Sequence, residues 1–186
     1  MKFLQLVTVG LAALISGICA APVTKGEPVI TNTELYTKFG GSSMREGTTY
    51  KAEIKWPKPD KPDPNEAIEA ARKAVCAMHF AYAIVSVKKT TKKGSKTKPT
   101  QITMDVEGFL WDLRLGSGGA AVVPPTKTLD TMKKSILGTQ VTLGAPTKKS
   151  KSQINSIASD YIANHKTFDP KNNNCKSFLN HMMAST

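Results

Sequence analysis

Residues 80–87 read Phe-Ala-Tyr-Ala-Ile-Val-Ser-Val, and residues 101–115 follow them after a basic loop. The first run is apolar and rich in residues that favour strands, so it predicts a central buried strand. In the second run apolar and polar residues first alternate and then give way to an apolar segment, which predicts another strand. Because the loop between them contains Gly94, we expect the two strands to form one long hairpin.

The hairpin is preceded by the clearest helix signal in the chain. Asp63 is suited to cap a helix, Pro64 to occupy its first position, and Glu66 stands three residues after the cap. We therefore expect a helix from about Pro64 to Met78. Further helices are expected over 128–137, 152–163 and 176–183, and further strands over 48–56 and 140–143. The sequence predicts a single α+β domain, a small, mainly antiparallel sheet with helices packed on one side.

Residues 57–64 contain four prolines, which predict a stiff, extended connector. This connector suggests a division of the chain into three parts. Residues 1–20 form a signal peptide, residues 21–63 an extended N-terminal segment that ends in the Pro-rich connector, and residues 64–186 the α+β domain.

The first twenty residues have the pattern of a secretory signal peptide. Lys2 is followed by an uncharged apolar stretch from Phe3 to Ile18, and then by small residues that favour cleavage after Ala20. The apolar stretch is short for a membrane helix, which needs about 20 apolar residues. The sequence therefore predicts a secreted, extracellular protein with no membrane span.

The chain is strongly basic, with a formal net charge of +12, and all but three of its 26 basic residues are lysines. Lysine lacks the planar fork with which arginine recognises guanine, so we expect no sequence-specific DNA binding. A solvated loop is one interpretation of the run between the two hairpin strands. Another is a site for polyanions such as RNA, anionic lipid or glycan. The run is also similar to a nuclear-targeting signal, which would act only after entry into a host cell. Its members are Lys88, Lys89, Lys92, Lys93, Lys96 and Lys98.

Removal of the signal peptide leaves two cysteines, Cys76 and Cys175. In a secreted protein an even pair predicts a disulfide. The bond would close a loop of about 100 residues, for which the chain-entropy model gives about 4–5 kcal/mol of stabilisation.

A second interpretation assigns chemistry to Cys175. Residues 174–179 place it at the start of an expected helix, where the helix dipole and the neighbouring Lys176 favour a thiolate. His79, at the start of the central strand, would then act as its base. The two interpretations exclude each other, because a disulfide sulfur is not a nucleophile. The sequence shows no metal-ligand spacing and implies no cofactor.

A strand histidine followed about a hundred residues later by Asn-Cys-x-x-Phe resembles the permuted papain-like proteins of the lecithin:retinol acyltransferase type. The resemblance covers Cys76 to Asn180. It implies that Cys175 is the nucleophile, that His79 is the base, and that a third polar residue stands on the next strand, at Asp105 or Thr103.

In its general features, and not in a motif, the whole chain is similar to the small secreted effector proteins of fungi, which are basic, short and poor in cysteine. This similarity implies a virulence-type effector that acts by binding a host component. We also expect a monomer stabilised by one disulfide, and the sequence leaves enzyme activity open without favouring it. Two alternatives stand beside it: a secreted cysteine hydrolase or acyltransferase, and a polyanion-binding protein.

Overall fold

In a computed structural model of the chain, residues 27–75, 77–95 and 97–186 are described. Their main sheet has the strand order β1-β4-β3-β2-β8, with the short β7 also paired to β4. Only the pairing of β1 with β4 is parallel, so the fold is α+β with a mainly antiparallel sheet. The strands are β1 (Val29–Asn32), β2 (Thr49–Trp56), β3 (His79–Lys92), β4 (Gln101–Asp112), β7 (Lys127–Thr128) and β8 (Gln140–Thr147).

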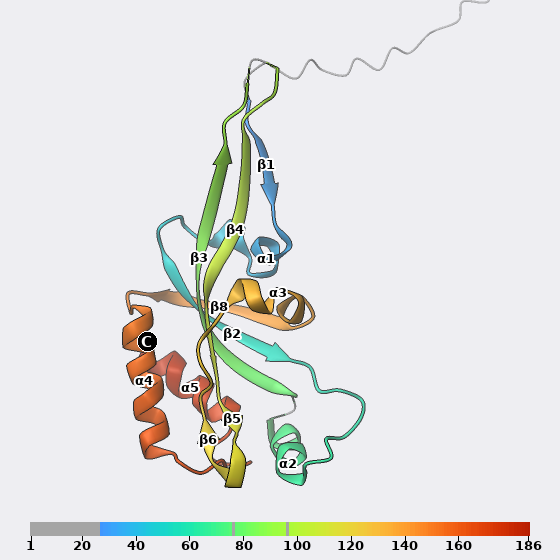
Figure 1. The fold of residues 1–186 in the computed structure, drawn as a ribbon, viewed down its shortest axis with the longest axis vertical. Coiled ribbons are helices and arrows are strands. Elements are labelled where there is room, and N and C mark those ends of the chain that lie inside the picture. The colour runs from blue at the N-terminus through green and yellow to red at the C-terminus, as the bar shows by residue number, and fades with distance from the viewer. Residues whose placement is uncertain (1–26, 76, 96) are drawn as a thin grey trace, which may run out of the picture.

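The predicted long hairpin is present and forms the axis of the molecule. β3 and β4 pair from Ala81 opposite Asp112 to Lys92 opposite Gln101. In Figure 1 their far ends project beyond the helices, with β1 running alongside. The last five residues of β3 are exposed, which shows that both faces of this projecting part meet solvent.

Helices cover both faces of the sheet, not one face as the sequence predicted. α1 (Glu34–Lys38) and α3 (Leu129–Leu137) pack on one side, and α4 (Lys151–Asn164) and α5 (Cys175–Ser185) on the other. Within β3, Ala81, Ala83 and Val85 belong to the first core, while Phe80, Tyr82 and Ile84 belong to the second. A continuous apolar run is typical of a strand that is buried on both faces, and this property of residues 80–87 indicated the two-sided cover.

The N-terminal segment of 21–63 is part of this fold from Val29 onward. β2 lies between β3 and β8 in the sheet, and Leu35 and Phe39 of the adjoining helical region are 1% exposed. A short 3-10 helix, Gly41–Ser43, links α1 to the turn before β2. The expected signal peptide lies outside the described residues. Among the described helices, none is long and apolar enough to cross a membrane.

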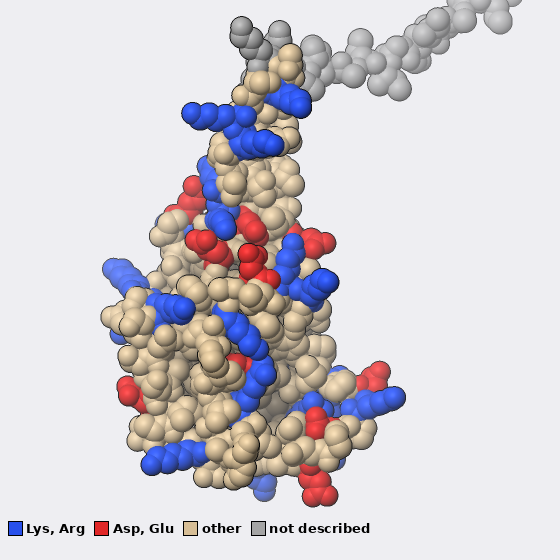
Figure 2. Space-filling model, viewed as in Figure 1, with Lys and Arg blue, Asp and Glu red and all other residues tan. Residues whose placement is uncertain are grey.

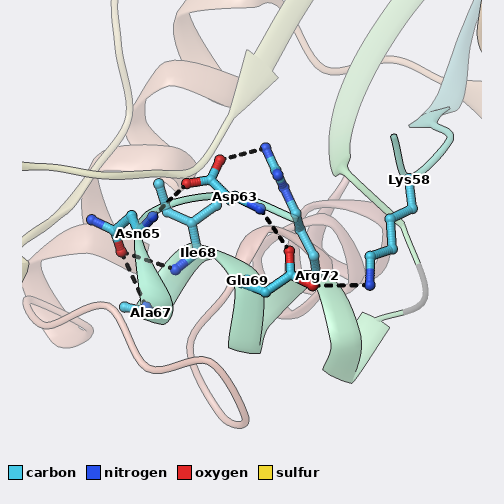
Figure 3. A network of polar contacts seen from close by, with 7 residues as sticks. All are labelled: Lys58, Asp63, Asn65, Ala67, Ile68, Glu69 and Arg72. Carbon is cyan, nitrogen blue, oxygen red and sulfur yellow. Dashed lines mark hydrogen bonds and ion pairs between the residues drawn. The ribbon is translucent and has the colours of Figure 1, made fainter. Parts of the chain in front are cut away.

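The helix after the Pro-rich connector, α2 (Glu66–Val75), begins later than predicted. Asn65 caps it, because its side-chain oxygen accepts hydrogen bonds from the N–H groups of Ala67 and Ile68, at 3.1 and 3.2 Å (Figure 3). Asp63 instead accepts the N–H of Asn65. The predicted cap was therefore displaced by two residues, since both side chains are good caps and the sequence did not rank them.

Between β4 and β7 the chain forms a small second ribbon at the end of the molecule opposite the projecting hairpin. β5 (Arg114–Leu115) pairs with β6 (Ala121–Val122), and the 3-10 turn Ser117–Gly119 connects them. The backbone of Ala121 donates to Lys166 and that of Phe168 to Gly119, so the ribbon is tied to the loop between α4 and α5. This loop carries the chain to the start of α5.

Candidate functional site

The site is centred on His79, the first residue of β3. Its Nε2 lies 3.0 Å from Oδ2 of Asp112, the last residue of β4. Asp112 stands opposite Ala81 in the hairpin, so the two side chains are diagonal neighbours on one face. Because the carboxylate only accepts, Nε2 carries the proton, and Nδ1 remains as the ring nitrogen for another partner.

Asp112 is buried and lies between two cations. Its side chain is 5% exposed, and the same Oδ2 accepts a hydrogen bond from Nε of Arg114 at 2.7 Å. Burial acts to raise the pKa of Asp112, but the hydrogen bonds and charges of His79 and Arg114 outweigh it and hold the pKa below its usual value. The carboxylate is therefore ionised at neutral pH and fixes the orientation of the His79 ring.

His79 is held as an imidazolium. Burial acts to lower its pKa, but the hydrogen bond to Asp112 and the interaction with the Cys175 side chain outweigh this effect and raise the pKa to about 9. The ring is also in contact with the Trp56 indole, at a centroid distance of 5.7 Å. A positively charged imidazole thus stands beside the sulfur of Cys175 at neutral pH.

Cys175 is the first residue of α5 and is a free, buried thiol that is 6% exposed. Asn174 caps this helix: its side-chain oxygen accepts the N–H groups of Lys176 and Ser177, at 2.9 and 3.1 Å. The N–H of Cys175 has no acceptor within the helix, because the first turn lacks a preceding turn. The sulfur therefore lies at the positive end of a helix dipole, with a backbone donor next to it.

A buried polar network fixes the loop that delivers Cys175. Asn173 accepts the hydroxyl proton of Tyr161 at 2.7 Å and donates to the carbonyls of His165 and Thr167, at 3.0 and 2.6 Å. The next residue, Asn174, donates to the carbonyl of Pro170. Two consecutive asparagines, 6% and 3% exposed, thus set the position of the α5 N-terminus.

His79, Asp112 and Cys175 line one cavity of about 410 Å³, a volume suited to a small ligand. Most of the other lining side chains are apolar. They are Trp56, Ile68, Ala71, Val75, Met78, Leu110, Leu113, Leu115, Met132 and Phe168, with Arg72, Arg114 and Ser135 as the polar members.

α2 forms one wall of this cavity and is held by the polar contacts drawn in Figure 3. Arg72 pairs with Asp63 at 2.8 Å, and Lys58 pairs with Glu69 at 3.1 Å. Glu69 also accepts the backbone N–H of Asp63; this bond and then the contact with Lys58 lower the pKa of Glu69. These contacts tie α2 to the Pro-rich connector.

The third residue implied by the family resemblance is not where we expected it. Asp105 accepts a hydrogen bond from Thr33 at 2.6 Å and stands opposite Lys88, far along the hairpin from His79. The carboxylate that contacts His79 is instead that of Asp112, on the same strand. The sequence did contain a signal for it, since a lone carboxylate inside the apolar run 109–113 has to find a partner when it is buried.

The sequence suggested that the charge of Lys176 acts on the thiol of Cys175, but in the structure Lys176 is directed to other partners. Its Nζ lies 3.2 Å from both carboxylate oxygens of Glu53 and 4.5 Å from the centroid of the Phe80 ring. The positive charge next to Cys175 comes instead from His79.

The expected disulfide involves Cys76, which lies outside the described residues. Its other half, Cys175, is a free thiol in this structure.

The lysine run occupies the projecting end of the hairpin, and Lys96 lies outside the described residues. Lys88 is 4.0 Å from Glu107, and Lys89 is 3.1 Å from Glu46. The others that are described, Lys92, Lys93 and Lys98, are exposed.

Among the described residues, no group of three or more His, Cys, Asp or Glu side chains is placed to hold a metal ion. Comparison with protein-family models, with curated proteins and with solved structures gave no match.

Proposed function

We propose that the protein is a thiol-dependent acyl hydrolase or acyltransferase, with Cys175 as nucleophile, His79 as acid and base, and Asp112 as the residue that orients His79. The observation that carries the proposal is the convergence of these side chains from β3, β4 and the N-terminus of α5 on one cavity. Enzymes that transfer acyl groups through a covalent intermediate use this arrangement, in which a nucleophile, a base and a group that orients the base lie within reach of one another.

The geometry supports a two-step reaction. The Cys175 thiolate attacks the carbonyl carbon of the acyl donor, and the backbone N–H of Cys175 stabilises the oxygen that becomes negative. His79 transfers its Nδ1 proton to the leaving group, and a thioester remains on Cys175. His79 then takes a proton from water or an acceptor alcohol, which attacks the thioester, and the sulfur leaves as the thiolate.

The charges of the site suit this sequence. Two cations, His79 and Arg114, share the single carboxylate of Asp112, which leaves an excess of positive charge for a thiolate at Cys175. A positive charge beside a cysteine sulfur favours attack by that sulfur on a carbonyl carbon.

The cavity favours an apolar acyl group. Trp56, Leu110 and Met132 contribute apolar surface to the wall of the cavity, and Cys175 itself is nearly excluded from bulk water. We infer that esters or thioesters of short aliphatic or aromatic acids fit better than acyl groups with polar side chains.

The expectations of secretion and of action on a host remain compatible with this activity, which an exported enzyme would exert on a host acyl group. The disulfide expectation is not compatible with it, because the reaction needs a free Cys175. A Cys76→Ser substitution separates them: the proposed reaction retains its rate, whereas a disulfide-stapled protein loses folding stability.

The first test is hydrolysis of p-nitrophenyl acetate and p-nitrophenyl hexanoate by the purified protein. We expect Cys175→Ala to abolish the activity while the protein stays folded, since alanine fits the buried space. His79→Gln should lower the rate by about 100-fold or more, because general acid–base catalysis contributes this much.

The matched control for the loss of a buried cysteine is Cys175→Ser, which keeps a nucleophilic atom but one that His79 activates less well. A circular dichroism melting curve shows whether each variant is folded. Hydrolysis that continues unchanged in a folded Cys175→Ala protein would exclude the proposed nucleophile.

A further inference from the structure

The search for a second site leads to the opposite end of the hairpin. Here β1, the end of β3 and the beginning of β4 form a three-stranded projection, which we call the basic arm (29–32, 88–95 and 97–104). Figure 2 shows Lys and Arg side chains gathered along this projection on the visible face, with acidic side chains lower down, where the arm joins the body.

The arm combines positive charge with exposed aliphatic side chains. Val29 and Ile30 are 48% and 63% exposed and are two of the few large apolar residues exposed in the described structure. Ile30 is in register with Ile102, which is in turn opposite Thr91, between the lysines of β3. Exposed apolar side chains of β1 and the lysines of β3 thus belong to the same three-stranded projection, on either side of β4.

The arm is also an unusual part of the sheet. β1 is exposed along its whole length, and within the described part of the chain no helix covers the last five residues of β3. Exposed edges of this kind are normally shortened or shielded by charge. The lysines of β3 shield the other edge of the arm by their charge, whereas the aliphatic residues of β1 stay exposed on the first edge.

We propose that the basic arm docks the protein on an anionic lipid surface. Lysine ammonium groups are attracted to anionic headgroups, and neighbouring aliphatic side chains enter the boundary between headgroups and acyl chains. A single-stranded nucleic acid fits less well, because such sites stack bases on aromatic rings and arginines. Residues 88–108 contain neither an aromatic residue nor an arginine.

The proposal does not depend on the proposed enzyme activity. His79 and Lys92 are the two ends of β3, so the arm begins about 30 Å from His79 and Lys92 lies about 40 Å from it. With the arm on a membrane, the cavity lies well away from the lipid. The two functions are therefore separable by mutation.

The test is sedimentation of the purified protein with vesicles of phosphatidylcholine, with and without phosphatidylserine. We expect binding only to the anionic vesicles, weakened by salt. In the arm variant, Gln replaces Lys88, Lys89, Lys92 and Lys93. Its affinity for anionic vesicles should fall by about 100-fold, since each lysine near an anionic surface raises the affinity several-fold.

The control removes the same charge from the body, with Gln at the exposed residues Lys134, Lys148, Lys149 and Lys171. This body variant should bind almost as the unmodified protein does. All variants share residues 1–28, so any contribution of the apolar N-terminal stretch cancels. If the arm and body variants lose binding equally, net charge alone is responsible and the proposal is wrong.

A second pair of variants tests the aliphatic contribution. Val29→Ser with Ile30→Ser should weaken vesicle binding several-fold without changing binding to heparin, whereas Val122→Ser, at the other end of the molecule, should change neither. Binding to heparin or RNA at physiological salt without binding to anionic vesicles would overturn the lipid assignment.

Discussion

At the scale of single residues, two aspartates on β4 differ in their partners: one contacts His79 and the other does not. Asp112 accepts from His79 and Arg114, while Asp105 accepts from Thr33 and has no contact with the cavity. Both residues were accessible to sequence reasoning, but only the register of the hairpin shows which of them reaches His79.

We expect Asp112→Asn to lower ester hydrolysis by about 100-fold, because an amide neither holds the imidazolium nor fixes its tautomer. The matched substitution Asp105→Asn should leave the rate within about twofold of the unmodified protein. Both rates are measured with p-nitrophenyl hexanoate after confirmation that the variants are folded. Equal losses in the two variants would contradict the role of Asp112.

The raised pKa of His79 also makes a prediction about stability. Since its folded-state pKa of about 9 exceeds the ordinary value of 6.5, protonation of His79 stabilises the fold fully below about pH 6.5. This contribution, about 3 kcal/mol, is lost as the pH rises through 9. The pKa of Asp112 is lowered in the folded protein, so its ionised carboxylate stabilises the fold at pH values above its ordinary pKa of 3.8. This stabilisation is lost as the pH falls through the folded-state pKa.

Urea unfolding from pH 5 to 10 tests this prediction, because this range lies between the ordinary pKa values of the carboxylates and those of lysine and tyrosine. The difference in unfolding free energy between the unmodified protein and His79→Gln should shrink toward high pH. Two curves that run parallel over this range would show that His79 is not held as an imidazolium.

At the scale of elements, the hairpin depends on one glycine. A Cβ atom at Gly108 would collide with the carbonyl oxygen of Ile84 on the neighbouring strand. β3 and β4 are the strands that carry His79 and Asp112, so a shift in their pairing would reach the site.

We expect Gly108→Ala to destabilise the protein by about 3 kcal/mol, as overpacking against a backbone atom does. Gly138→Ala is the control, because the nearest atom to its Cβ would be 3.7 Å away and its φ of −83° suits alanine. Thermal unfolding of both variants measures the difference. A Gly108→Ala protein as stable as its control would show that the strands are packed less closely than described here.

Sequence patterns identified most elements of this fold and missed particular ones for physical reasons. The strand of 48–56 and the helices of 128–137 and 152–163 were predicted almost to their ends, because caps and periodicity are local signals. β1 was missed, since four exposed residues carry no alternation and the strand forms only by pairing with β4. Cys175 and His79 were recognised by type, but their meeting with Asp112 depends on tertiary structure.

At the scale of the whole molecule, the β3–β4 hairpin joins two regions with different chemistry. At one end a nearly buried thiol, an imidazolium and a carboxylate line an apolar cavity. At the other end lysines and exposed aliphatic residues lie on a projecting, exposed part of the sheet. Because the ends are separated by the length of β3, the arm variant should hydrolyse a soluble ester at the unmodified rate.

The central claim is that Cys175 forms a covalent acyl intermediate. The most direct measurement is the intact mass of the native protein, without reductant, after brief mixing with p-nitrophenyl acetate and quenching in acid, followed by peptide mapping. We predict one added acetyl group, located on Cys175, that is absent in Cys175→Ala and formed much more slowly in His79→Gln. A protein that gains no acetyl group, or whose Cys175 is found bonded to Cys76, would contradict the account.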